Sequence, residues 1–126
     1  MEQAGRSVTF VLPALPPSCN SLYQIIYSQR RVELKPDCRR WKSDMKQYVP
    51  RFDVSEGTEL RIDFEFNFNH AKRRFDAANL MKLAIDCICE KVGVNDKAVR
   101  HGSWYSINNT EREFVQVTLM EIGAAQ

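Results

Sequence analysis

Residues 59–68, which read ELRIDFEFNF, decide the fold. Apolar side chains occupy every second position from Leu60 to Phe68, and charged or amide side chains occupy the positions between them. Successive side chains of a strand point to opposite faces of a sheet, so this alternation predicts a strand with one buried face and one polar face.

The segments on either side predict a small α+β domain. Apolar patterns bounded by prolines, glycines and turn residues give the elements that follow in chain order. These are a strand at 8–12, a hairpin at 22–27 and 31–34 turning at 28–30, a helix from Lys35 to Pro50, the strand 59–68, a helix at 77–92 capped by Gly93, and a second hairpin at 99–106 and 114–120 turning at 108–110. We expect residues 1–126 to form a single domain, with two main helices packed on one face of a mixed β-sheet.

Composition excludes several classes of protein. The 126 residues are 44% hydrophobic and 27% charged, as in ordinary globular domains, and the net charge is only +2. No segment is apolar enough for a signal peptide or a membrane span, and the cytoplasm is the expected location. The four cysteines form no CxxC pair, which argues against a zinc site, and a disulfide framework is not expected without an export signal.

The helix at 77–92 carries a polar stripe beside its apolar one. Asn79, Lys82 and Asp86 are spaced by three and then four residues, so they share one side of the helix. Asp76 stands just before the helix, and Asp96 follows the turn after Gly93. Taken singly, each has a structural explanation: Asp76 as an N-cap, Lys82 with Asp86 as an i, i+4 surface pair, and Asn95-Asp96 as a turn.

Taken together, these residues fit phosphodiester chemistry. Carboxylates such as Asp76 and Asp96 hold Mg²⁺, and a lysine such as Lys82 stabilises charge on the phosphate. The basic run Lys72-Arg73-Arg74 directly before them is suited to the phosphate backbone of DNA.

A second basic cluster lies in the first predicted helix. Arg39 and Arg40 precede Trp41 there, Lys42 and Lys46 follow it, and Tyr48 lies further on. Two interpretations are open: a surface that contacts DNA, or a solvated helix face around core aromatic residues.

Three separated motifs are similar to one family. Residues 76–82 read DAANLMK and are followed by Asp86, residues 93–99 read GVNDKAV, and residues 16–23 read PPSCNSLY. They resemble the D-x-D-N-x-x-K-x-x-x-D pattern, the post-helix glycine with a D-D or N-D pair, and the P-P-S-x-N-x-x-Y segment of the RusA family of Holliday-junction resolvases. The resemblance covers residues 12–122, and residues 118–122 resemble the family's closing strand.

The resemblance implies a homodimeric endonuclease of phage or prophage type, in the cytoplasm of a bacterial or phage-infected cell. It would depend on Mg²⁺, with Mn²⁺ as a substitute, and resolve four-way DNA junctions by paired symmetric nicks in recombination or repair. It implies no organic cofactor and no membrane partner. By position, Asp76 and Asp96 would bind the metal and Lys82 would be the catalytic lysine. Asn79, Asp86 and Asn20 would support them.

The chain departs from this pattern at Ala78, where the family has its second carboxylate, and at Asn95. Several arrangements remain open. Asn79 or Asp86 could complete the metal site, or Asp63 or Glu65 could do so from the polar face of the strand 59–68. The alternative function is a junction-binding accessory dimer that is catalytically weakened or inactive. An unrelated α+β interaction domain is disfavoured because three motifs agree.

Overall fold

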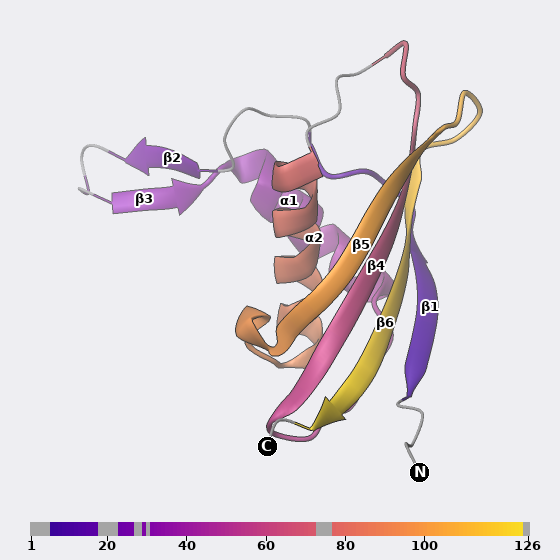
Figure 1. The fold of residues 1–126 in the computed structure, drawn as a ribbon. Coiled ribbons are helices and arrows are strands. Elements are labelled where there is room, and N and C mark those ends of the chain that lie inside the picture. The colour runs from indigo at the N-terminus through magenta and orange to yellow at the C-terminus, as the bar shows by residue number, and fades with distance from the viewer. Residues whose placement is uncertain (1–5, 18–22, 27–28, 30, 73–76, 125–126) are drawn as a thin grey trace.

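The structure is a computed structural model that describes residues 6–17, 23–26, 29, 31–72 and 77–124, and Figure 1 shows its fold. Within these residues, six strands, two α-helices and two short 3-10 helices form one small α+β domain. In chain order the elements are β1 (Ser7–Leu12), β2 (Tyr23–Ile26), β3 (Arg31–Leu34), α1 (Pro36–Met45), η2 (Lys46–Tyr48), β4 (Thr58–Phe68), α2 (Ala77–Val92), η3 (Asp96–Ala98), β5 (Val99–Asn108) and β6 (Phe114–Ala124).

The main sheet has four strands in the order β1-β6-β4-β5. β6 is antiparallel to both β1 and β4, whereas β5 runs parallel to β4, so the sheet is mixed as predicted. The predicted hairpin between 99–106 and 114–120 is wrong, because β4 lies between β5 and β6. The most deeply buried strand, β4, takes an inner position, where it pairs on both sides, and the polar, largely exposed β5 takes the edge.

The parallel pair β4–β5 is connected through α2. Parallel strands need such a crossover, and it places α2 against one face of the sheet. Every second residue of β4 from Leu60 to Phe68 is buried on that face, with Phe64 1% and Phe66 0% exposed. These two rings stack, with centroids 5.4 Å apart.

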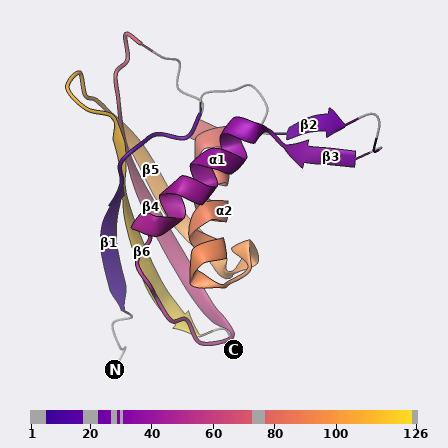
Figure 2. The same ribbon diagram turned by 180° about the vertical axis from the view of Figure 1, so that it is seen from behind.

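Both helices cover the same face, and the opposite face of the sheet has no helix over it (Figures 1 and 2). The helices contribute core side chains at helical spacing: Cys38, Trp41 and Met45 from α1, and Leu80, Leu83, Ala84, Cys87 and Ile88 from α2. The predicted bounds of α2 are confirmed, and Gly93, at φ 84°, ends it by donating its N–H to the carbonyl of Cys89 at 2.8 Å. The first helix is regular only to Met45, and η2 continues it to Tyr48.

The hairpin of β2 and β3 is confirmed and projects away from the sheet and helices (Figure 2). Its turn falls largely outside the described residues.

Three cysteines, Cys38, Cys87 and Cys89, are buried free thiols, and burial raises the pKa of Cys87 to about 11. In the part of the chain that the structure describes, no helix has the length and apolarity to cross a membrane.

Candidate active site between α2 and the start of β5

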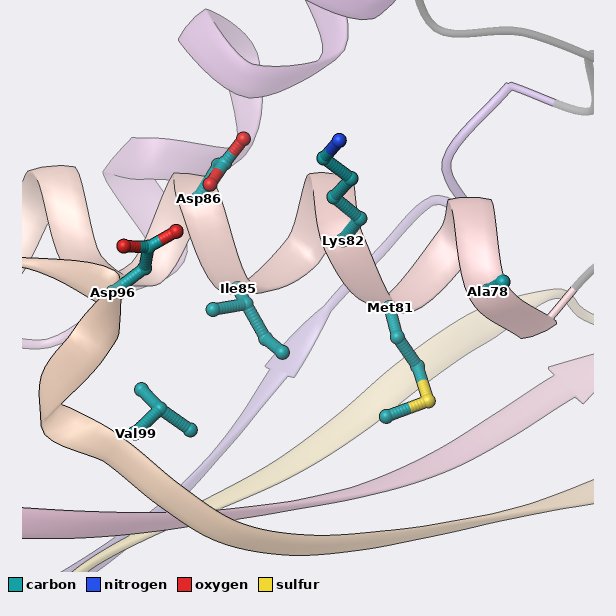
Figure 3. Close-up of a pocket in the computed structure, with 7 residues that line it drawn as sticks. All are labelled: Ala78, Met81, Lys82, Ile85, Asp86, Asp96 and Val99. Carbon is teal, nitrogen blue, oxygen red and sulfur yellow. The ribbon is translucent and has the colours of Figure 1, made fainter.

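A pocket of about 360 Å³ lies where the outer side of α2 meets the start of β5 (Figure 3). It is lined by Ala78, Met81, Lys82, Ile85, Asp86, Asp96 and Val99. The turn after Gly93 brings Asp96 there. Asn95 fixes this turn, because its side-chain oxygen accepts the N–H of Lys97 at 2.9 Å and caps η3. Two residues predicted from the sequence, Lys82 and Asp96, therefore share one pocket.

Asp86 joins them. Lys82 and Asp86 are one helical turn apart on α2, and Asp96 extends toward the helix from the segment that leads into β5 (Figure 3). The apolar side chains of Met81, Ile85 and Val99 lie on the β5 side of these charged groups. Asp86, predicted only as a supporting residue, is thus the carboxylate that accompanies Asp96.

Asp86 is a partly buried carboxylate with two other acidic side chains nearby. Burial is the largest influence and raises its pKa, and the negative charges of Asp96 and Glu90 raise it further. The positive charges of Lys42 and Lys82 act in the opposite direction without cancelling the rise. Two carboxylates that repel one another in a shared pocket are stabilised by a bound cation.

A lysine from α1 also belongs to this region, and the sequence analysis missed it. The side chain of Lys42 is only 17% exposed and forms an ion pair with Glu90, which Lys46 also contacts at 2.7 Å. Burial would raise the pKa of Glu90, but these hydrogen bonds outweigh it and the pKa is lowered. Glu90 follows Asp86 by one turn, so Lys42 places a positive charge beside Asp86. The basic residues of α1 can be recognised in the sequence, but the packing of α1 against α2 cannot.

Ala78 lies at the far end of the pocket from Asp96, with Lys82 between them (Figure 3). Eight residues separate Ala78 from Asp86, which corresponds to about 12 Å along a helix axis. A carboxylate at position 78 would therefore not replace Asp86 as the neighbour of Asp96.

The hypothesis that Asp63 or Glu65 completes the site is wrong. Both lie on the face of β4 turned away from the helices, because strand side chains alternate. Asp63 accepts hydrogen bonds from Arg61 and from the hydroxyl of Ser103 at 2.8 Å, and Glu65 accepts one from Tyr105 at 2.5 Å. Burial raises the pKa of Asp63, but its hydrogen bonds outweigh this and lower it.

The remaining predicted residues divide into two groups. Asp76, Arg73, Arg74 and Asn20 lie outside the described residues. Asn79 is half-buried on α2 and is not among the residues lining the pocket, while Lys72 is exposed in the turn after β4.

On α1, Arg39 and Arg40 are exposed, and each approaches a nearby acid: Glu33 at 3.8 Å and Asp37 at 3.5 Å. Trp41, which follows them, is buried and donates its indole N–H to the carbonyl of Ala14 at 3.0 Å. Trp41 is therefore a core residue, whereas the prediction that Arg39 and Arg40 bind DNA stays a prediction.

No protein-family model matches this chain, and no curated protein matches it. Among the described residues, no three His, Cys, Asp or Glu side chains gather closely enough to hold a metal ion. Lys82, Asp86 and Asp96 are the charged residues that line the pocket.

Proposed function

We propose that the protein is a magnesium-dependent endonuclease that nicks branched DNA, with four-way junctions as the expected substrate. The observation that carries this proposal is the pocket shared by Lys82, Asp86 and Asp96. The sequence resemblance to the RusA resolvases supports it independently, because the motifs alone assign Lys82 and Asp96 to such a site.

The donor set fits a divalent cation. Mg²⁺ binds carboxylate oxygens and commonly keeps several waters, so two protein carboxylates suffice to hold it. Asp86 and Asp96 would be these ligands, and Asp76 is a third candidate from the sequence. Bound there, the ion would supply an activated water and neutralise charge on the phosphate oxygens.

The protein side chains have separate tasks in this proposal. The ammonium of Lys82, one turn from Asp86, would bind the phosphate and stabilise the charge that develops on it. Lys42, held by Glu90, would favour the ionised form of Asp86, which is the form that binds a cation. A homodimer would place one such pocket on each of two opposed strands of a junction with approximate two-fold symmetry.

A second candidate function is a junction-binding accessory dimer with weak or no catalysis. Ala78 supports it, because the side chain that lines the pocket there is a methyl group, where the RusA pattern has a carboxylate. Binding of DNA would then depend on the basic residues, and Asp86 with Asp96 would have no role in cutting.

A synthetic four-way junction distinguishes the two functions. We expect paired nicks that require Mg²⁺ or Mn²⁺ and that fall by about 100-fold or more in Asp96→Asn and Lys82→Ala, the usual cost of removing one stabilising group. Asp53→Asn is the matched control, since Asp53 is an exposed carboxylate outside the pocket. Tight junction binding without nicking under either ion would refute the enzyme in favour of the accessory dimer.

A further inference from the structure

A second hollow adjoins the candidate active site. It measures about 200 Å³ and is lined by Ile62, Met81, Ile85, Val99, Arg100, His101 and Gly102. Met81, Ile85 and Val99 line both hollows, so the two are neighbouring parts of one groove between α2 and β5. We call this the α2–β5 groove.

The groove stays open because β5 is an edge strand and presents little side-chain bulk there. β5 pairs only with β4, and Gly102 carries no side chain. No larger residue fits at this position, since a Cβ on Gly102 would lie 2.4 Å from the backbone oxygen of Ile62. Trp104 follows two residues later on the same face of the sheet and is 44% exposed.

The polarity of the groove changes along its length. One end holds Lys82, Asp86 and Asp96, and Arg100 lines the other end; His101 lines that end too, but it pairs with Arg61, so its side chain belongs to the opposite face of the sheet. The middle is apolar and is formed by Met81, Ile85 and Val99. A phosphate backbone alone would find no partner in this middle part, whereas a nucleotide offers both a charged phosphate and a flat, largely apolar base.

We infer that the α2–β5 groove binds an unstacked nucleobase of the DNA strand held at the candidate active site. The base would pack against Met81 and Ile85, with one flanking phosphate at Lys82 and the bound cation and the other near Arg100. This inference rests on the proposed function and adds the part of the substrate that the groove recognises.

Physical chemistry gives such a groove a preference. Bases stack on apolar and aromatic side chains without regard to sequence, and the exposed indole of Trp104 extends the apolar surface available to them. Removing a base from a duplex is costly, and the cost is smallest where the base is already unpaired. The groove would therefore favour branch points and single strands over continuous duplex.

The methyl group of Met81 reports on the groove directly. The wild-type protein is labelled with ¹³C at its methionine methyls and titrated, in Ca²⁺, with the dinucleotide pTpT and with the same backbone lacking both bases. We expect the Met81 signal to shift with pTpT and at least tenfold less with the abasic compound. Met45, which is buried in the core under α1, is the internal control and should not shift. Equal shifts with both compounds, or none with pTpT, would overturn the inference.

A groove-filling variant adds an affinity test. Ile85→Trp should weaken pTpT binding about tenfold and leave the abasic compound unaffected, and Val32→Trp, a substitution at an exposed site on β3, should change neither. If Ile85→Trp does not fold, the wild-type titration still decides the matter. A Met81 shift that depends on protein concentration alone would assign the groove to a second copy of the chain and overturn base binding.

The nicking assay separates this inference from the proposed function. If the protein nicks junctions but its Met81 signal does not shift with pTpT, the base site is overturned and the endonuclease proposal is supported. A base-dependent Met81 shift in a protein that does not nick junctions would support the base site and overturn the endonuclease.

Discussion

Replacing Asp86 by asparagine should make the protein more stable and, at the same time, unresponsive to Mg²⁺. Asp86 is half-buried, shares its pocket with Asp96 and lies one helical turn before Glu90. Relief of one like-charge i, i+4 pair, Asp86 with Glu90, is worth about 0.2–0.5 kcal/mol. Burial of the charge and the repulsion from Asp96 add to this in the same direction.

The pH dependence follows from the raised pKa of Asp86. A carboxyl whose pKa is raised on folding favours the folded state fully below its unfolded value, near 3.8, and this contribution is lost as the pH rises through the folded pKa. The advantage of Asp86→Asn should therefore be largest at neutral pH and disappear below about pH 3.8. In the wild type, Mg²⁺ at ten times its dissociation constant should contribute about 1.4 kcal/mol.

Urea denaturation with and without Mg²⁺ measures both effects. With an m-value of about 1.5 kcal/mol/M, Asp86→Asn should raise the midpoint by about 0.1–0.3 M without Mg²⁺ and abolish the Mg²⁺-dependent increase. Asp63→Asn is the control, and it should change the free energy of unfolding in the opposite direction. The pKa of Asp63 is lowered on folding, so removing its carboxylate should lower the free energy of unfolding by about 0.2–1 kcal/mol at pH 7. The loss should become smaller as the pH falls through the folded pKa. Equal Mg²⁺ responses in wild type and Asp86→Asn, or a lower midpoint for Asp86→Asn without Mg²⁺, would refute the reasoning.

Two further predictions concern the edge strand and the basic run. Gly102→Ala should lower the free energy of unfolding by about 1–3 kcal/mol, measured by heat or urea, because the added Cβ meets the backbone of Ile62. The control, Ser103→Ala, loses one side-chain hydrogen bond, worth about 0.5–1.5 kcal/mol. Equal losses in the two variants would contradict the close approach of β4 and β5. Changing residues 72–74 together to glutamine should flatten the salt dependence of junction binding by about 2.7 in log–log slope, three phosphate contacts. An unchanged slope, with a reduced slope in the double variant Arg39→Gln and Arg40→Gln, would place the DNA surface on α1.

The sequence predicted those parts of the fold that local patterns determine. The bounds of α2 follow from its apolar spacing and from Gly93, and β4 follows from strict alternation. The pairing of the last two strands was predicted wrongly, because nearness in sequence favours a hairpin. Pairing is decided instead by which strand buries most apolar surface, and β4 has that property and separates β5 from β6.

The candidate site was likewise predicted only where a local sequence pattern determines it. Lys82 and Asp96 were identified from a motif, and helical spacing placed Asp86 beside Lys82. The contribution of Lys42 depends on how α1 packs against α2, and no local pattern encodes that contact. Asp63 and Glu65 were possible ligands as acids of the strand that precedes α2, but the alternation of β4 puts them on its polar face, opposite the apolar face that the helices cover.

The position of β6 has a consequence for the order of folding. β6 joins β1 to β4, and the hydroxyls of Thr9 and Thr118, 109 residues apart, meet across the first of these pairings. Contacts between segments so distant in sequence form slowly, because the loop between them must close first. The helices and the β4–α2–β5 unit can associate earlier, but β1 has no partner in the main sheet until β6 is present. During synthesis on the ribosome, β6 follows the other five strands in chain order and completes the sheet that β1 begins.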